Sequence, residues 1–133
     1  MASGILSPEI NRFMAKVLII EDDKFLTKIY KAKLEKEGLE ADFANNGEEG
    51  LEKLEKTKPK AVLLDLVMPL MDGFEVLEHV QKDPKLRKIP ILVLSNLGQE
   101  DDRERAKKLG AKDFIVKSDT SIKAVVDLIK KYI

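Results

Sequence analysis

The sequence predicts an α/β fold in which five parallel β-strands alternate with five helices and form one doubly wound sheet. Two observations lead to this prediction. Short apolar runs recur along the chain, which is typical of parallel strands that are covered on both faces. Longer segments between them carry apolar residues at helical spacing. This alternation favours right-handed crossovers, with helices on both faces of the sheet.

The five predicted strands differ in how apolar they are. Three are continuous apolar runs, which suit the buried centre of a parallel sheet: residues 17–20, 61–64 and 91–94. The runs at residues 41–44 and 113–116 include an aspartate and are weaker, as expected for the two edges.

The first two helices are predicted from their N-caps and from apolar spacing. Asp23 is a candidate N-cap for the first helix. Asn46, followed three residues later by Glu49, resembles a capping box at the start of the second. The apolar residues at helical spacing in these segments are Leu26, Ile29, Tyr30, Leu34, Leu51 and Leu54.

The other three helices range from apolar to almost wholly charged. The third predicted helix ends at Asp83–Pro84, because proline does not continue a helix. The fourth, Gln99 to Leu109, has only Ala106 and Leu109 as apolar residues, and Gly110 stands where a C′ residue belongs. The apolar faces of the third and last helices are Val76, Leu77 and Val80, and Ile122, Val125, Val126, Ile129 and Ile133.

Composition limits what the chain can do. Its 133 residues, 44% of them hydrophobic, suit one domain with its own core. Lys+Arg and Asp+Glu are 24 each, so we expect neither direct nucleic-acid binding nor membrane association. The absence of cysteine excludes thiolate chemistry, and the single histidine, His79, excludes a multi-histidine metal site. With no apolar run of 18 residues and no secretory signal, the predicted location is the cytoplasm.

Residues 1–15 precede the βα pattern and are predicted to be an N-terminal extension to a domain at residues 16–133. Ser7 followed by Pro8 is typical of a helix start, so a short helix is expected there. A functional arm and an added or frayed terminus are both open interpretations.

Reactive or polar side chains follow four of the five predicted strands. They are Glu21, Asp22 and Asp23 after the first strand, Asp65 after the third, Ser95 at the end of the fourth and Lys117 after the fifth. The carboxyl ends of parallel strands meet at one edge, so these side chains converge. Crowded carboxylates repel unless a cation neutralises them, and oxygen ligands favour Mg²⁺. A carboxylate beside Mg²⁺ can attack a phosphoryl group, which a lysine and a serine would contact.

This ordered set of motifs resembles the receiver domain of bacterial two-component response regulators, over nearly the whole chain. Besides the acidic cluster, the matching segments are Leu64–Pro69 and Asp72–Gly73. Ser95 lies 30 residues after Asp65 and Lys117 lies 22 residues after Ser95, similar to the spacing in that family. The resemblance implies a flavodoxin-like sheet of strand order 2-1-3-4-5.

The resemblance also implies the metal site and the phosphoacceptor. Asp65 would accept the phosphoryl group. Mg²⁺ would be held by Glu21, Asp22, Asp65 and the backbone carbonyl of Val67. Asp23 is an alternative member of the acidic pair, although Glu21 and Asp22 directly follow the apolar run.

Two further residues would complete the catalytic set around Asp65. Lys117 would pair with the phosphoryl group, and Ser95 would donate a hydrogen bond to it. Ser95 and Phe114 would form a switch, in which the aromatic ring changes rotamer on activation.

Some positions depart from the family pattern or have ordinary explanations. Ser118 stands where proline, often after a cis bond, is usual, and Asn96 stands where alanine or glycine is usual. Taken singly, the matching residues also read as strand-end carboxylates, helix caps or a solvated lysine. His79 is assigned to the surface and Met68–Pro69 to turn geometry.

The implied function is a phosphorylation-controlled signalling module. A sensor histidine kinase or a phosphotransfer protein would phosphorylate Asp65 with Mg²⁺ assistance, and a conformational switch would alter protein contacts. Apart from this transfer and its own dephosphorylation, the chain is not expected to be an enzyme. A stand-alone receiver and one excised from a longer protein are both open.

Residues 99–133 are the predicted face for a downstream protein target or for self-association. On the last helix this face includes an apolar stripe of Ala124, Leu128 and Tyr132, which is wider than core packing requires. Packing of the stripe against a neighbouring helix is the alternative.

Three other functions fit parts of the pattern. A phosphohydrolase with an aspartyl-phosphate intermediate commonly has a second acid two residues after the nucleophile, where this chain has Val67. A flavin or nucleotide binder would need a glycine-rich loop after the first strand, where this chain has acids. A pseudo-receiver that only binds partners would not need the complete set of reactive residues.

Overall fold

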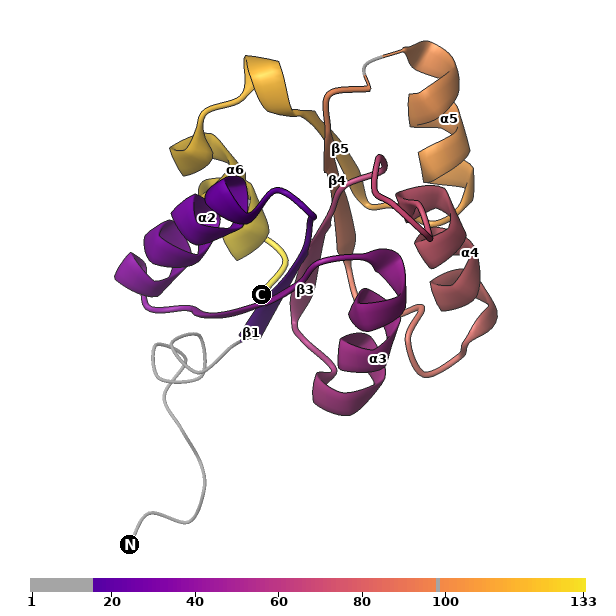
Figure 1. The fold of residues 1–133 in the computed structure, drawn as a ribbon, viewed down its shortest axis with the longest axis horizontal. Coiled ribbons are helices and arrows are strands. Elements are labelled where there is room, and N and C mark those ends of the chain that lie inside the picture. Colours follow the sequence, from indigo (N-terminus) through magenta and orange to yellow (C-terminus); the bar gives the residue numbers. More distant parts are fainter. Residues whose placement is uncertain (1–15, 98) are drawn as a thin grey trace, which may run out of the picture.

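The computed structural model describes residues 16–97 and 99–133, so the short helix expected within residues 1–15 lies outside the described residues. Five strands form one parallel sheet in the order β2-β1-β3-β4-β5 (Figure 1). They are β1 (Lys16–Ile20), β2 (Glu40–Ala44), β3 (Ala61–Leu64), β4 (Ile91–Ser95) and β5 (Asp113–Val116). Both the predicted strand order and the predicted edge strands, β2 and β5, are confirmed.

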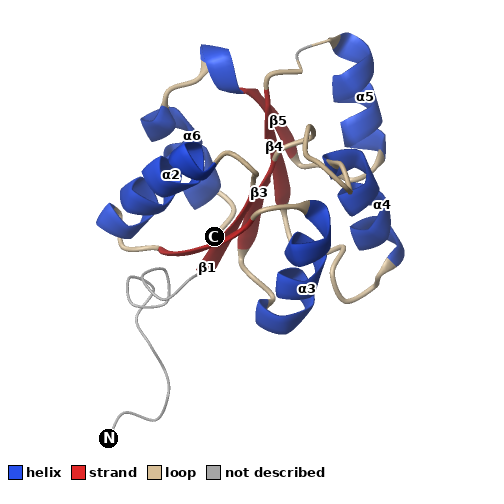
Figure 2. Ribbon diagram, viewed as in Figure 1, coloured by secondary structure: helices blue, strands red, loops and turns tan. Residues whose placement is uncertain are grey.

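Helices cover both faces of the sheet, with α2 and α6 on one side and α3, α4 and α5 on the other (Figure 2). Their bounds are α2 (Lys24–Lys36), α3 (Gly47–Thr57), α4 (Gly73–Lys82), α5 (Glu100–Lys108) and α6 (Ile122–Lys130), with a 3₁₀ turn η1 (Lys117–Asp119) after β5. Within the described ranges, none of these helices is long and apolar enough to cross a membrane.

The sheet divides the core into two apolar clusters. Alternate residues of each central strand face opposite clusters: Val17 and Ile19 pack toward α2 and α6, whereas Leu18 and Ile20 pack toward α3 and α4. All residues of β3 and β4 are buried. This two-sided burial is the reason that the central strands read as continuous apolar runs.

Both predicted N-caps, Asp23 and Asn46, are observed, but the capping box predicted at Asn46 is not complete. The Asp23 carboxylate accepts the N–H of Phe25 and that of Leu26, as predicted for the start of α2. Asn46 accepts the N–H of Glu49, but the prediction of a complete capping box there is wrong. The Glu49 carboxylate lies 3.4 Å from the ammonium of Lys53, one turn later, which competes for it.

A complete capping box forms instead at the start of α4, between Asp72 and Glu75. The charged helix α5 begins at Glu100, with Gln99 at the N-cap. It ends before Gly110, whose φ of 98° matches its predicted C′ role. Helix α6 ends at Lys130, so Tyr132 and Ile133 lie beyond the helix to which the sequence assigned them.

Candidate functional site

Backbone pairing places two acids side by side at the carboxyl edge of the sheet. The Asp65 N–H donates to the carbonyl of Ile20 at 3.0 Å, and the Glu21 N–H donates to the carbonyl of Ala44 at 3.0 Å. Hydrogen bonding in the sheet therefore continues one residue past β1 and β3, and it fixes Glu21 and Asp65 at matching positions on adjacent strands.

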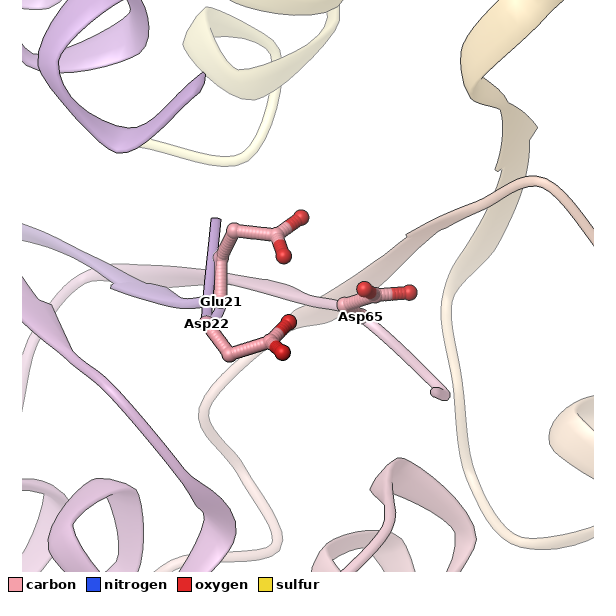
Figure 3. A group of neighbouring side chains, drawn as sticks. All are labelled: Glu21, Asp22 and Asp65. Atoms are coloured by element: carbon pink, nitrogen blue, oxygen red, sulfur yellow. The ribbon is translucent and has the colours of Figure 1, made fainter. Parts of the chain in front are cut away.

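Three carboxylates converge at this edge (Figure 3). Glu21, Asp22 and Asp65 each offer an oxygen that lies within 4.8 Å of the others. Glu21 and Asp65 are buried, whereas Asp22 is exposed. Asp23, the alternative member of the acidic pair, directs its carboxylate to the cap of α2. The geometry therefore brings Glu21 and Asp22, rather than Asp23, together with Asp65.

Lys117, which follows β5, supplies the positive charge of the cluster. Its ammonium donates to Oε1 of Glu21 and, at 3.1 Å, to Oδ2 of Asp65. Burial alone would lower the pKa of Lys117, but the two carboxylates outweigh it and raise the pKa above its usual value. Lys117 is therefore a cation held between two acids that come from β1 and β3.

Burial dominates the electrostatics of Glu21. Desolvation, assisted by the neighbouring Asp65 charge, raises the pKa of Glu21 to about 7, even though Lys117 and the Asp23 N–H act to lower it. One lysine therefore does not fully compensate this group of acids.

These residues fit a hard divalent cation. The side-chain donors are all carboxylate oxygens, and they lie close enough to share one ion. The raised pKa of Glu21 shows that Lys117 does not fully offset the negative charge of the cluster. The Val67 N–H donates to Oδ1 of Asp65 at 3.3 Å, so the Val67 backbone adjoins the cluster. Its carbonyl as a metal ligand remains a prediction.

The two expected switch residues lie on one face of the sheet. Val93 pairs with Phe114 and Ser95 with Val116, so Ser95 and Phe114 project to the same side. Ser95 is fully buried, and its Oγ accepts the Leu97 N–H at 3.3 Å. Phe114 is half-buried against the cluster of α3, α4 and α5.

The positions that depart from the expected pattern leave the reactive groups in place. The described residues hold no cis peptide bond, so Lys117–Ser118 is trans. Asn96 is exposed. His79 is an exposed residue of α4, consistent with its assignment to the surface, and Met68 packs against the core.

Gly73 was part of a motif, but its physical role was not predicted. A Cβ there would lie 2.4 Å from the carbonyl oxygen of Asp65 and 2.7 Å from Cα of Leu66. The Gly73 N–H also donates to the carbonyl of Leu66 at 3.0 Å. Glycine directly after the Asp72 cap was the available signal, because it marks close approach of a helix start to another backbone.

Comparison with known proteins relates the chain to one family. A family model described as the response regulator receiver domain matches residues 17–129. Protein PilH of Pseudomonas aeruginosa is 37% identical over 106 residues, which cover 78% of this chain and 86% of that protein. A CpxR homolog of Haemophilus influenzae, a transcriptional regulatory protein, is 38% identical over 104 residues. The match covers 78% of this chain but only 44% of the CpxR homolog.

Solved structures give the same relationship. Chemotaxis protein CheY4 of Vibrio cholerae superimposes with a TM-score of 0.83 and 27% identity, over 90% of this chain and 99% of that one. The phosphorylated cyanobacterial phytochrome response regulator RcpA superimposes with a TM-score of 0.77 and 28% identity, over 89% and 90% of the two chains.

Proposed function

The chain belongs to the response regulator receiver family, whose members act in phosphorylation-controlled two-component signalling, and from that premise we propose that Asp65 is its phosphoacceptor. The observation that carries this proposal is the juxtaposition of Asp65 with Glu21, Asp22 and Lys117. We propose that Glu21, Asp22, Asp65 and the Val67 carbonyl hold Mg²⁺. When bound, Mg²⁺ offsets the repulsion between a carboxylate and an incoming phosphoryl group.

In the proposed transfer, an Asp65 carboxylate oxygen attacks the phosphorus of a phosphohistidine. The new O–P bond forms as the P–N bond breaks, and the electron pair of that bond stays on the departing imidazole. The Lys117 ammonium, already 3.1 Å from Oδ2 of Asp65, is placed to pair with the phosphoryl oxygens. Ser95 then gives up its hydrogen bond with the Leu97 N–H, and its hydroxyl donates a hydrogen bond to a phosphoryl oxygen.

Loss of the phosphoryl group would regenerate Asp65 by attack of water on phosphorus. Aspartyl-phosphate phosphohydrolases place a second acid two residues after the nucleophile; here that residue is Val67, with 59% of its surface exposed. An apolar side chain at this position offers no base that would speed the attack of water. We therefore propose slow self-dephosphorylation of a receiver rather than the rapid turnover of a phosphohydrolase.

An apolar rim, defined as Phe25, Val67 and Leu70, supports docking of the phosphodonor. These are the exposed large apolar side chains of the described residues, and all three follow β1 or β3 at the edge that carries Asp65. Phosphotransfer brings the donor's histidine to that edge. We propose that the rim contacts apolar residues around the phosphohistidine of a cytoplasmic sensor kinase or phosphotransfer protein.

We propose a second partner surface on α5, β5 and α6. A groove of about 500 Å³ runs there, lined among others by Arg103, Phe114 and Ala124. The expected apolar stripe on α6 is narrower than predicted, because Leu128 and Tyr132 pack against the core and only Ala124 is exposed. We propose that phosphorylation changes binding of a downstream protein, or self-association, at this groove.

Identifying the residue that carries the acyl phosphate tests the assignment of Asp65. The chain is incubated with acetyl phosphate and Mg²⁺ and then reduced with borohydride, which converts an aspartyl phosphate to homoserine. Peptide mapping should find homoserine at position 65 of the wild-type protein and none in Asp65→Asn. Homoserine at position 22 instead, or at no position, would overturn the assignment.

A further inference from the structure

Helix α5 is held to the sheet by little apolar contact. Ala106 is its buried residue, and the N-cap Gln99 makes no side-chain cap hydrogen bond. Two arginines of α5 instead cover aromatic rings of neighbouring elements. Arg105 lies 4.1 Å from the ring centroid of Phe74 in α4, and Arg103 lies 5.0 Å from that of Phe114 in β5. Both distances are within the range of cation–π attraction.

The two arginine contacts differ in what lies beneath them. Phe74 of α4 is buried in the core between the sheet and helices α3, α4 and α5, and it has no part in the proposed switch. Phe114 lines the surface groove together with Arg103, and it shares a sheet face with Ser95. The guanidinium of Arg103 therefore covers the ring whose position the switch would change.

We propose that Arg103 is a positioning residue for Phe114, holding the ring at the groove and so favouring the unphosphorylated conformation. This inference rests on the proposed function, because it requires Ser95 to move toward a phosphorylated Asp65. When the Ser95 hydroxyl moves away, it vacates volume on the side of the sheet where Phe114 lies. The ring fills that volume only by leaving the guanidinium of Arg103.

The size of the effect follows from the contact. A cation–π contact at a partly exposed site corresponds to about a two- to fivefold change in an equilibrium constant. Without Arg103, the switched conformation becomes more populated by that factor, and a ligand that selects it binds correspondingly tighter. Arg105 provides a matched control, because its removal also takes one charge and one aromatic contact from α5 but leaves Phe114 covered.

The test measures binding of beryllofluoride with Mg²⁺ and the state of the ring together. Arg103→Ala, Arg103→Lys and Arg105→Ala are labelled with fluorophenylalanine, and the Phe114 resonance is assigned with Phe114→Leu. We expect Arg103→Ala to bind beryllofluoride about two- to fivefold tighter than wild type. Its Phe114 resonance without ligand should move toward the position seen at saturation in wild type.

The controls separate the inference from general loosening of α5. Arg105→Ala should keep the wild-type affinity and the wild-type Phe114 resonance, and Arg103→Lys, which retains a cation, should lie between wild type and Arg103→Ala. Equal tightening in Arg103→Ala and Arg105→Ala, or an unmoved Phe114 resonance in both Arg103 variants, overturns the role of Arg103. If wild type and Asp65→Asn bind beryllofluoride equally, the proposed function itself fails.

Discussion

The ammonium of Lys117 lies 3.1 Å from Oδ2 of Asp65 and also bonds Oε1 of Glu21, so one lysine joins the acids that follow β1 and β3. The same lysine is placed to pair with a phosphoryl group on Asp65. We therefore propose two roles for its charge: it stabilises the metal-free fold, and in the proposed function it pairs with the phosphoryl group on Asp65.

Removing the charge of Lys117 should affect both the stability of the metal-free protein and the response to phosphorylation. In metal-free buffer, Lys117→Ala should unfold at a lower temperature than wild type, because breaking a buried ion pair costs on the order of 3 kcal/mol. Mg²⁺ should restore part of that loss, since a cation replaces the ammonium, while the response to phosphorylation remains impaired. Lys123→Ala, which removes an exposed lysine of α6, is the charge-matched control. Equal losses of Mg²⁺ affinity and of phosphorylation response would make Lys117 purely structural.

The adjacent acids Asp22 and Asp23 should differ in how strongly the same substitution affects Mg²⁺ binding. Asp22→Asn removes a carboxylate that points into the cluster, so Mg²⁺ affinity should fall by at least about tenfold. In metal-free buffer the same variant should be more stable than wild type, because like-charge repulsion is relieved. Asp23→Asn keeps the helix cap and should change Mg²⁺ affinity little. Calorimetric titration and thermal unfolding check both, and the reverse order of affinities would assign the metal to Asp23.

Stability of the metal-free protein should depend on pH through Glu21. Its pKa rises from 4.5 to about 7 in the folded state because of burial, so folding takes up a proton between these values. The resulting stabilisation is complete below pH 4.5 and is lost as the pH rises through about 7. Measured in chelator, the unfolding free energy of wild type relative to Glu21→Gln should fall from pH 5 to pH 8. A constant difference over that range would show that Glu21 is charged throughout.

Gly73 should not tolerate a side chain. Gly73→Ala places a Cβ against the backbone of Asp65 and Leu66, so the start of α4 must move away. We expect a loss of about 1–3 kcal/mol in urea unfolding, with slower phosphorylation because Asp65 shifts. A control is Gly38→Ala, at a loop position with φ of 84°, which should destabilise the fold without slowing phosphorylation of the folded fraction. If phosphorylation slows equally in both variants, the close approach of Gly73 to Asp65 has no specific effect on the site.

The sheet and the cluster of site residues were predictable because both depend on local pattern. Continuous apolar runs report burial on both faces, which fixed the central strands, and parallel strands bring their carboxyl ends to one edge. Asp65 and Glu21 could therefore be placed together from residues 44 positions apart in the chain.

The remaining features depend on tertiary contacts that no local pattern contains. Glu49 turns to Lys53 instead of completing its capping box, and the sequence offers it both partners. Tyr132 appeared to be surplus apolar surface, but its hydroxyl donates to Asp113 and its ring packs on the core. The contact of Arg103 with Phe114 depends on how α5 docks, which charge patterning alone does not specify.

Intact mass after incubation with acetyl phosphate tests the central claim most directly. Wild type should gain the mass of one phosphoryl group with Mg²⁺ and essentially none in chelator, because the acids around Asp65 repel phosphate without the cation. Asp65→Asn should gain none under either condition. A full mass gain in Asp65→Asn, or in wild type without Mg²⁺, would contradict the account of Asp65 as a phosphoacceptor in a magnesium site.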